Sequence, residues 1–363
     1  MNNSPAGQSS ISMDLLSRLL LSPDTASLAQ VEALRTLTPD QFDSLMATAH
    51  ANHVVVRAMK IYEAIMLGAG QKLLAENADR IVMTELGRID RATKHLGPVL
   101  DAFQQEGIDV TVMKTLDHWP DFGSDIDLYT DAPYGTVCAI MQSRFNAHIA
   151  ARSWGDRLAG KWNFEIPGLP EAIEIHMGRL GQTGEQTFLA ANVSARARTL
   201  RFGDQLFPVP SASDRIMIST LQRMYRHFYF RLCDIIDSAS LCNSGDLDYN
   251  DLQRSAQAAG IWEGVATYLV LVSDYVEKYS GDGIALPNFV KRSARFDGKV
   301  MYCGGLFLRV PILPQSADLY RSQLAGTLRR GEIHSSARLG LLPWLATAAA
   351  VGQKITGSDK GIW

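Results

Sequence analysis

The sequence has few cysteines and no paired-cysteine motif. Its four cysteines are scattered without a CxxC pair, at Cys138, Cys233, Cys242 and Cys303. This spacing disfavours both a disulfide framework and a structural zinc site. A reducing, cytoplasmic location is the default expectation for such a chain.

An excess of charge and a long apolar run are also missing. The net charge is −3, so no basic surface for a long nucleic acid is indicated. The longest apolar run, residues 339–352, contains Pro343 and is shorter than the ~20 residues that span a bilayer. We expect a buried or interface helix there and no membrane span. Residues 1–12 are small and polar without a signal pattern, and we expect them to be disordered.

The remaining composition is that of a chain with ample material for a core. Of 363 residues, 46% are apolar and 20% are charged, which suggests two or three packed units. Apolar spacing is mostly helical over residues 13–105 and again over 211–363, and strand-like runs lie within 106–210. We therefore predict an α+β fold, in which a small mixed sheet at 106–210 is flanked by N-terminal and C-terminal helical regions.

The N-terminal helical region carries no obvious chemistry. The segment Thr38 to Gln41 is typical of a helix cap with proline at the first helical position. His50 and His53 are three residues apart on the following helix, but no acid or cysteine lies nearby in the sequence. We interpret both as surface or packing residues. A long helix is expected from about residue 71 to 105.

The informative stretch is Gly123-Ser124-Asp125-Ile126-Asp127-Leu128-Tyr129. It predicts a tight turn that leads directly into a strand, where alternation places both aspartates on one side, about 7 Å apart. Two carboxylates so placed can share a hard divalent cation. The small residues before them let backbone N–H groups approach a phosphate.

This stretch has other interpretations. An Asp-rich turn that merely caps a strand is the simplest. Aspartyl phosphatases and metal-dependent glycosyltransferases also use a DxD, but there the apolar strand precedes the motif. Here a polar segment, residues 117–124, precedes it and the apolar residues follow. This order favours nucleotidyl transfer.

Flanking strands offer further candidates. Residues 108–113 predict a strand that ends at Lys114, which is either a triphosphate contact or an ordinary exposed lysine. Residues 161–166 and 172–177 alternate apolar and polar side chains. Glu174 then lies on the polar face of its strand as a third carboxylate, with Glu165 as the alternative. Three acids on adjacent strands can bind two divalent ions, one at the acceptor oxygen and one at the triphosphate.

The C-terminal region adds a charged pattern. Arg223, Arg226, His227 and Arg231 follow one another at helical spacing, shortly before two aspartates. The pattern fits either a solvated helix with internal Arg–Asp pairs or a face turned toward a ligand. Arg223 and His227 are the candidates for nucleotide contact.

The order of strand, Lys114, GSDID turn, helix and Glu-Ile-His resembles the DNA polymerase β type nucleotidyltransferase superfamily. More narrowly, it is similar to a bacterial group of template-independent nucleotidyltransferases with helical flanks, across most of the chain up to about residue 281. The resemblance implies Asp125, Asp127 and Glu174 as metal ligands and catalytic residues, and Gly123 and Ser124 as the phosphate-contacting turn. That group has Lys-Gly and a helical stretch before the acid turn. Here a short segment, residues 116–122, replaces it and brings Asp117, His118 and Trp119 as new lining.

The resemblance implies an Mg²⁺-dependent enzyme, with two ions and Mn²⁺ as a substitute. It would move an NMP, AMP by default, from an NTP to a small molecule or a protein and release pyrophosphate. The alternative is a non-catalytic, regulatory protein of the same fold, such as an antitoxin-like binding partner of a second polypeptide. Acceptor identity, base preference and oligomeric state do not follow from fold resemblance.

Overall fold

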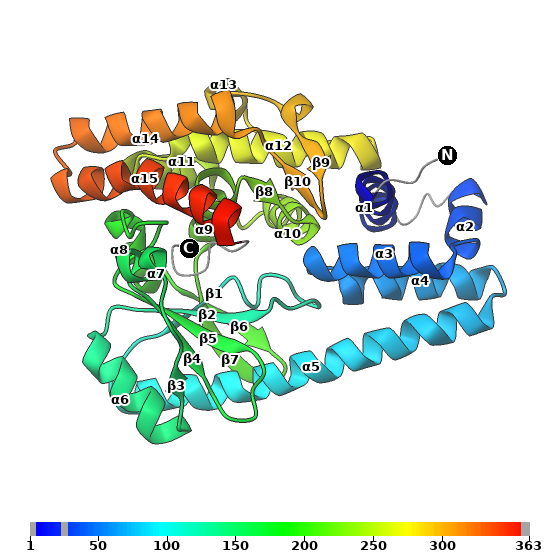
Figure 1. Cartoon of the computed structure of the whole chain (residues 1–363), viewed down its shortest axis with the longest axis horizontal. Coiled ribbons are helices and arrows are strands. Elements are labelled where there is room, and N and C mark those ends of the chain that lie inside the picture. The colour runs from blue at the N-terminus through cyan, green and yellow to red at the C-terminus, as the bar shows by residue number, and fades with distance from the viewer. Residues whose placement is uncertain (1–4, 23–27, 357–363) are drawn as a thin grey trace.

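The computed structural model describes residues 5–22 and 28–356 and has the expected mixed α+β architecture (Figure 1). A small sheet lies between a group of N-terminal helices and a group of C-terminal helices. The N-terminal helices are α1 (Pro5–Leu21), α2 (Leu28–Arg35), α3 (Pro39–Ala51), α4 (Val55–Gly68) and α5 (Lys72–Gln105).

Helix α1 corrects the expectation of disorder at the N-terminus. It begins at Pro5, and only residues 1–4 of the expected segment lie outside the described residues. Leu16 and Leu19 are fully buried, and the Ser17 hydroxyl lies 2.6 Å from the hydroxyl of Tyr275 in the C-terminal region. Tertiary packing of this kind stabilises a helix whose own sequence is a weak helix former.

The start of α3 confirms the predicted cap. The Gln41 backbone N–H donates to the Thr38 hydroxyl at 3.3 Å, and the Thr38 N–H donates to the Gln41 side chain at 2.9 Å, with Pro39 at the first helical position. This reciprocal pair satisfies two helix-terminal N–H groups. The long helix α5 also begins and ends within one residue of its prediction.

The central sheet has five strands in the order β1-β2-β5-β4-β3. Strands β2 and β5 are parallel, and the other neighbours are antiparallel. The elements of this part are β1 (Thr111–Met113), β2 (Asp125–Thr130), α6 (Tyr134–Phe145), β3 (His148–Ile149), α7 (Trp154–Ala159), β4 (Lys161–Glu165) and β5 (Ala172–Met177). Strand β5 matches its prediction, whereas β1 is shorter than the expected 108–113.

Alternation in the two parallel strands separates core from site. Ile126 and Leu128 in β2 and Ile173 and Ile175 in β5 are fully buried. The residues between them therefore project from the opposite face of the sheet. Strand pairing aligns Asp127 with Glu174, so the fold carries the two predicted acids side by side.

The C-terminal region is only partly the helical tail that the sequence predicts. After β5 come α8 (Thr187–Ala195), the hairpin β6 (Arg198–Phe202) and β7 (Gln205–Val209), α9 (Ala212–Thr220), the π-helical η2 (Leu221–His227), β8 (Tyr229–Phe230), α10 (Leu232–Asn243), α11 (Tyr249–Ala259), α12 (Trp262–Ser280), α13 (Asn288–Ser293), η3 (Gly298–Val300), β9 (Tyr302–Gly304), β10 (Phe307–Arg309), η4 (Ile312–Ser316), α14 (Ala317–Arg329) and α15 (Ile333–Thr356). Strands β8, β10 and β9 form a small antiparallel sheet. Strands of two or three residues are too short to produce an alternating pattern.

Helix α15 contains the long apolar run and is only partly buried along it. Leu339 is 2% exposed, whereas Trp344 is 75% exposed, so the expected burial holds for one side of the helix. In the part of the chain that the structure describes, no helix combines the length and apolar character needed to cross a membrane.

Candidate functional site

A cavity of about 210 Å³ lies where the polar face of the central sheet meets the segment around η2. All eight predicted site residues line it. They are Lys114, Gly123, Ser124, Asp125, Asp127, Glu174, Arg223 and His227. A larger cavity of about 940 Å³ between α1, α12 and η3 contains none of them.

The strand register explains how the acids meet. Asp127 and Glu174 are paired across the parallel strands β2 and β5. Oxygen atoms of these two carboxylates and a ring nitrogen of His176 all lie within 4.8 Å of one another. The alternative acid, Glu165, is exposed at the end of β4 and lies outside the cavity lining. Of the two candidates, Glu174 is the one that reaches the aspartates.

Two lysines neutralise the paired acids. Lys114 Nζ lies 2.6 Å from Asp127 Oδ1, and Lys161 Nζ lies 2.5 Å from Glu174 Oε2. Lys114 adopts φ 52°, the left-handed region that non-glycine residues seldom occupy. This backbone conformation follows directly after β1 and belongs to the turn that carries the lysine to the cavity. Asp125 forms no ion pair within the described residues.

Burial and neighbouring charges raise the pKa values of two of the acids and lower that of the third. Burial raises the pKa of Asp127 to about 7, against the charge of Lys114. Burial and the charge of Glu174 also raise the pKa of Asp125. For Glu174 the effect of burial is outweighed by the hydrogen bond from His176 and the charge of Lys161, which hold its pKa well below the usual value. Asp125 and Asp127 therefore resist ionisation in this buried site, and a cation placed beside them favours their charged forms.

The sequence predictions missed Lys161 and His176. Lys161 stands opposite His176 in the β4–β5 ladder, on the same face as Glu174. His176 Nε2 lies 2.8 Å from Glu174 Oε1, and burial lowers the pKa of this histidine. The signal was present, since both are polar residues at alternate positions of predicted strands.

The turn before β2 is held by a residue of α5. Arg88 Nη1 donates to the Gly123 carbonyl at 3.2 Å and pairs with Glu171 Oε1 at 2.7 Å. Gly123 does not have a positive φ, and a Cβ added there would lie 3.6 Å from His53 Cε1, an ordinary contact. The fold itself does not require glycine at this position. Ser124 also faces the cavity, where its hydroxyl donates to Asp125 at 3.3 Å.

The opposite wall of the cavity is cationic. Arg226 and Arg231 line it, and neither forms an ion pair within the described residues. Arg223, in contrast, is 1% exposed, and its Nε lies 2.7 Å from Asp234 Oδ2. Burial and three neighbouring arginines, Arg226 first, hold the pKa of His227 well below its usual value. The interpretation of this segment as a solvated helix is wrong, because Arg223 and Asp234 are both buried.

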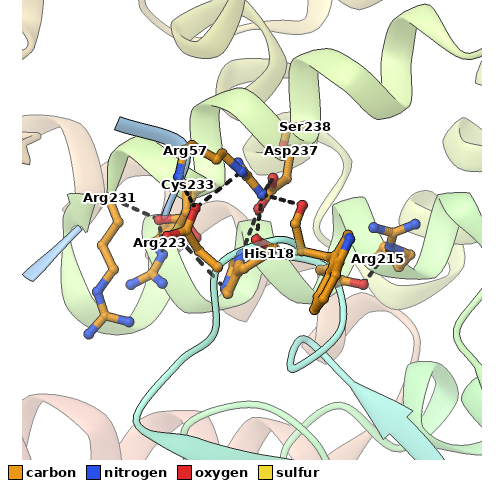
Figure 2. Close-up of polar contacts among 12 residues, drawn as sticks. Arg57, His118, Arg215, Arg223, Arg231, Cys233, Asp237 and Ser238 are labelled. Atoms are coloured by element: carbon orange, nitrogen blue, oxygen red, sulfur yellow. Dashed lines mark hydrogen bonds and ion pairs between the residues drawn. The ribbon is translucent and has the colours of Figure 1, made fainter. Parts of the chain in front are cut away.

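Of the three residues that segment 116–122 is predicted to add to the cavity lining, the structure places one there. His118 lines the cavity. Asp117 is outside the lining, and its Oδ1 lies 2.8 Å from Arg215 Nε. Trp119 is also outside the lining; its side chain is half exposed, and its ring contacts the Phe202 ring in an edge arrangement. Figure 2 shows His118 beside Asp237 and Cys233, with Arg57 on the other side of Asp237.

The donor set on the strands fits hard divalent cations. Asp125, Asp127 and Glu174 offer only carboxylate oxygens, the ligands that Mg²⁺ takes from proteins. The ammonium groups of Lys114 and Lys161 already place positive charge against two of these carboxylates. A site that holds cations in this way is suited to Mg²⁺, with Mn²⁺ as a substitute.

Comparison of the chain with protein-family models, with curated proteins and with solved structures found no match. The nucleotidyltransferase resemblance therefore stays a prediction from the residues quoted above.

Proposed function

We propose that the chain is a template-independent, metal-dependent nucleotidyltransferase. It transfers an NMP unit, AMP by default, from an NTP to a hydroxyl, phosphate or carboxylate oxygen of a small molecule or a protein, and pyrophosphate leaves. The observation that carries the proposal is the convergence of Asp125, Asp127 and Glu174 in one cavity whose other wall is cationic. Carboxylates that can bind a metal lie in the same cavity as Arg226 and Arg231, which form no ion pair among the described residues and can bind phosphate. This combination suits phosphoryl-group chemistry.

Asp125, Asp127 and Glu174 are the residues that would hold Mg²⁺. The bound ions supply Lewis-acid stabilisation of charge on the reacting phosphate oxygens. Arg226 and Arg231 bind the triphosphate, because their guanidinium groups reach the cavity without a carboxylate partner. Small residues at Gly123 and Ser124 let the phosphate chain approach the turn.

Nucleotide binding on this site requires an exchange of partners. The cavity of about 210 Å³ is smaller than the ~300–1,000 Å³ of most small-molecule sites, and the Lys114 and Lys161 side chains that line it are paired with the acids. When metal replaces these ammonium groups, both lysines are free to contact phosphate oxygens. Apo and nucleotide-bound protein should therefore differ in the positions of these two side chains.

The direct test uses NTPs labelled at the α-phosphate. Purified protein is incubated with each NTP, candidate acceptors and a cell lysate, with Mg²⁺ or with EDTA. Mg²⁺-dependent transfer of label to a lysate protein or to a small molecule is expected, and the two products are separated by size. Folded wild-type protein that shows neither transfer nor Mg²⁺-dependent NTP binding would refute the proposal.

The same experiment separates the non-catalytic alternative. The internal pairing of Asp127 and Glu174 with lysines is compatible with a protein that has kept the fold without turnover. Such a protein would bind a second polypeptide tightly and retain it at stoichiometric level through purification. Mg²⁺-dependent label transfer by the isolated chain excludes that function as the only one.

A further inference from the structure

A second group of ligand-type side chains lies beside the carboxylates and plays no part in the proposed reaction. His53, His118 and Cys233 each offer one ligand atom, and these three atoms lie within 4.8 Å of one another. His118 Nε2 is 3.9 Å from Cys233 Sγ, and the two imidazole rings are 5.8 Å apart in an edge arrangement. The three residues come from the N-terminal helices, the sheet region and the C-terminal helices.

Backbone contacts hold the three residues in place. Asn52, which ends α3, accepts hydrogen bonds from the N–H groups of Leu232 and Cys233 at 2.9 and 3.3 Å. These two hydrogen bonds connect the residue before His53 to the start of α10. Asn52 Nδ2 also donates to the Leu306 carbonyl at 2.8 Å. His53 has φ 52°, so a strained backbone is maintained at this point by contacts around it.

A second layer of contacts orients His118. Its Nδ1 lies 2.6 Å from Asp237 Oδ2, and Asp237 Oδ1 pairs with Arg57 Nη2 at 2.7 Å (Figure 2). Arg57 Nη2 also donates to the His118 carbonyl at 2.5 Å. A carboxylate on one ring nitrogen, with the other nitrogen directed at a thiol, is the arrangement that orients metal-binding histidines.

We propose that His53, His118 and Cys233 form a zinc site, distinct from the magnesium site on the strands. Two imidazole nitrogens and one thiolate suit Zn²⁺, whereas Mg²⁺ takes oxygen ligands. The 3.9 Å between nitrogen and sulfur needs only a small contraction to bring both to ordinary zinc–ligand distances. Since His53 and His118 also line the cavity, the fourth coordination position faces it, where a water can bind.

This zinc site accounts for two features that the magnesium site does not use. His53 Nδ1 is buried and has no hydrogen-bond partner among the residues that the structure describes. Cys233 is fully buried at the start of a helix, and His118 is its polar neighbour. A bound ion would also cross-link three parts of the chain, which predicts that zinc raises thermal stability.

The test uses metals alone and needs no enzymatic assay. Wild-type protein is stripped with a chelator and titrated with Co²⁺, whose thiolate complex gives a charge-transfer band in the near ultraviolet. Zn²⁺ is then added in competition with a chromophoric chelator. The expected results are a thiolate–cobalt band that zinc abolishes, one zinc per chain and a higher melting temperature with zinc.

Variants locate the ligands. Cys233→Ser should lose the cobalt band and bind zinc at least 100-fold more weakly. Cys242→Ser is the matched control, because Cys242 is a free cysteine on the same helix, outside the cluster. Asp125→Asn should leave zinc binding unchanged, which separates this site from the strands.

Two outcomes overturn the zinc site. One is wild-type protein that gives no thiolate–cobalt band. The other is a folded Cys233→Ser variant that binds zinc as tightly as wild type. If that variant does not fold, the cobalt spectrum of the wild-type protein alone decides. Neither outcome bears on Mg²⁺-dependent transfer, so failure here and failure of the proposed function are distinguishable.

Discussion

The two walls of the cavity differ in how their charged side chains are paired. On the strand wall, the pairs Lys114–Asp127 and Lys161–Glu174 face the cavity and remain 8 to 16% exposed. On the helix wall, formed by the segment around η2, the Arg223–Asp234 pair is buried, with side chains 1 and 4% exposed. A ligand can replace a lysine at the strand wall, whereas displacing Arg223 would leave Asp234 as a buried charge without its partner. Charged pairs on the two walls of one cavity therefore differ in how readily a ligand can displace them.

The comparison is tested most strongly by Asp125→Asn. This change removes the charge of a proposed metal ligand at nearly constant shape from an exposed position, so folding should be preserved while transfer falls by roughly 10³-fold. Steady-state label transfer and thermal melting measure the two effects. Glu165→Gln is the matched control, because Glu165 lies outside the cavity and should keep wild-type activity. Unchanged transfer in Asp125→Asn would show that this carboxylate of the strand wall takes no part in the reaction.

Arg223→Met tests the buried pair. The change leaves Asp234 buried without its cation, and the free energy of unfolding should fall by about 3–5 kcal/mol. Asp234 also accepts the Arg231 backbone N–H at 2.7 Å, so the start of α10 should loosen as well. Urea denaturation measures the loss. A fully stable variant with weakened NTP binding would instead make Arg223 the nucleotide contact that the sequence predicted.

Arg226→Gln sharpens the contrast on the same wall. Arg226 has no ion pair to lose within the described residues, so stability should stay within about 0.5 kcal/mol of wild type. The affinity for NTP should fall about 10-fold, the loss expected for one charge-assisted hydrogen bond. Calorimetric titration with a non-hydrolysable NTP and Mg²⁺ measures it. Unaltered affinity would show that the arginine contacts solvent only.

Gly123→Ala gives the smallest expected effect on folding. The added Cβ meets only ordinary contacts, so the unfolding free energy should change by less than about 0.5 kcal/mol. If phosphate approaches this turn closely, NTP affinity still falls several-fold because the methyl group stands in its way. Gly135→Ala, at an open position in α6, controls for the substitution itself. Equal NTP affinity in both variants would place the phosphate away from the turn.

The strand wall could be predicted from the sequence because its geometry is local. The GSDID turn and the alternation around Glu174 place each acid on a known face of a known strand, and the parallel pairing of β2 with β5 then brings them together. The same alternation would have found Lys161 and His176. The choice of Glu174 over Glu165 needed the strand register, because both glutamates have apolar neighbours on both sides and only Glu174 is paired with Asp127.

The helix wall could not be predicted in this way. Arg223 and His227 reach the cavity through the π-helical η2, whose winding departs from the 3.6-residue period on which helical spacing rests. Asp234, the buried partner of Arg223, lies on α10, and the spacing of residues in the sequence does not predict this contact. His53 was interpreted as a surface or packing residue because its cysteine neighbour lies far away in the chain.

The sequence by itself therefore determined the α+β class, the turn and the three acids on adjacent strands, since turns and strand alternation depend on near neighbours. Only the tertiary structure decided which lysines pair with those acids and that Arg223 is buried against Asp234 while Arg226 has no ion pair among the described residues. It also decided that His53, His118 and Cys233 lie close together. Such contacts join segments far apart in the chain, and packing of the whole fold, rather than any local preference, sets the distances between them.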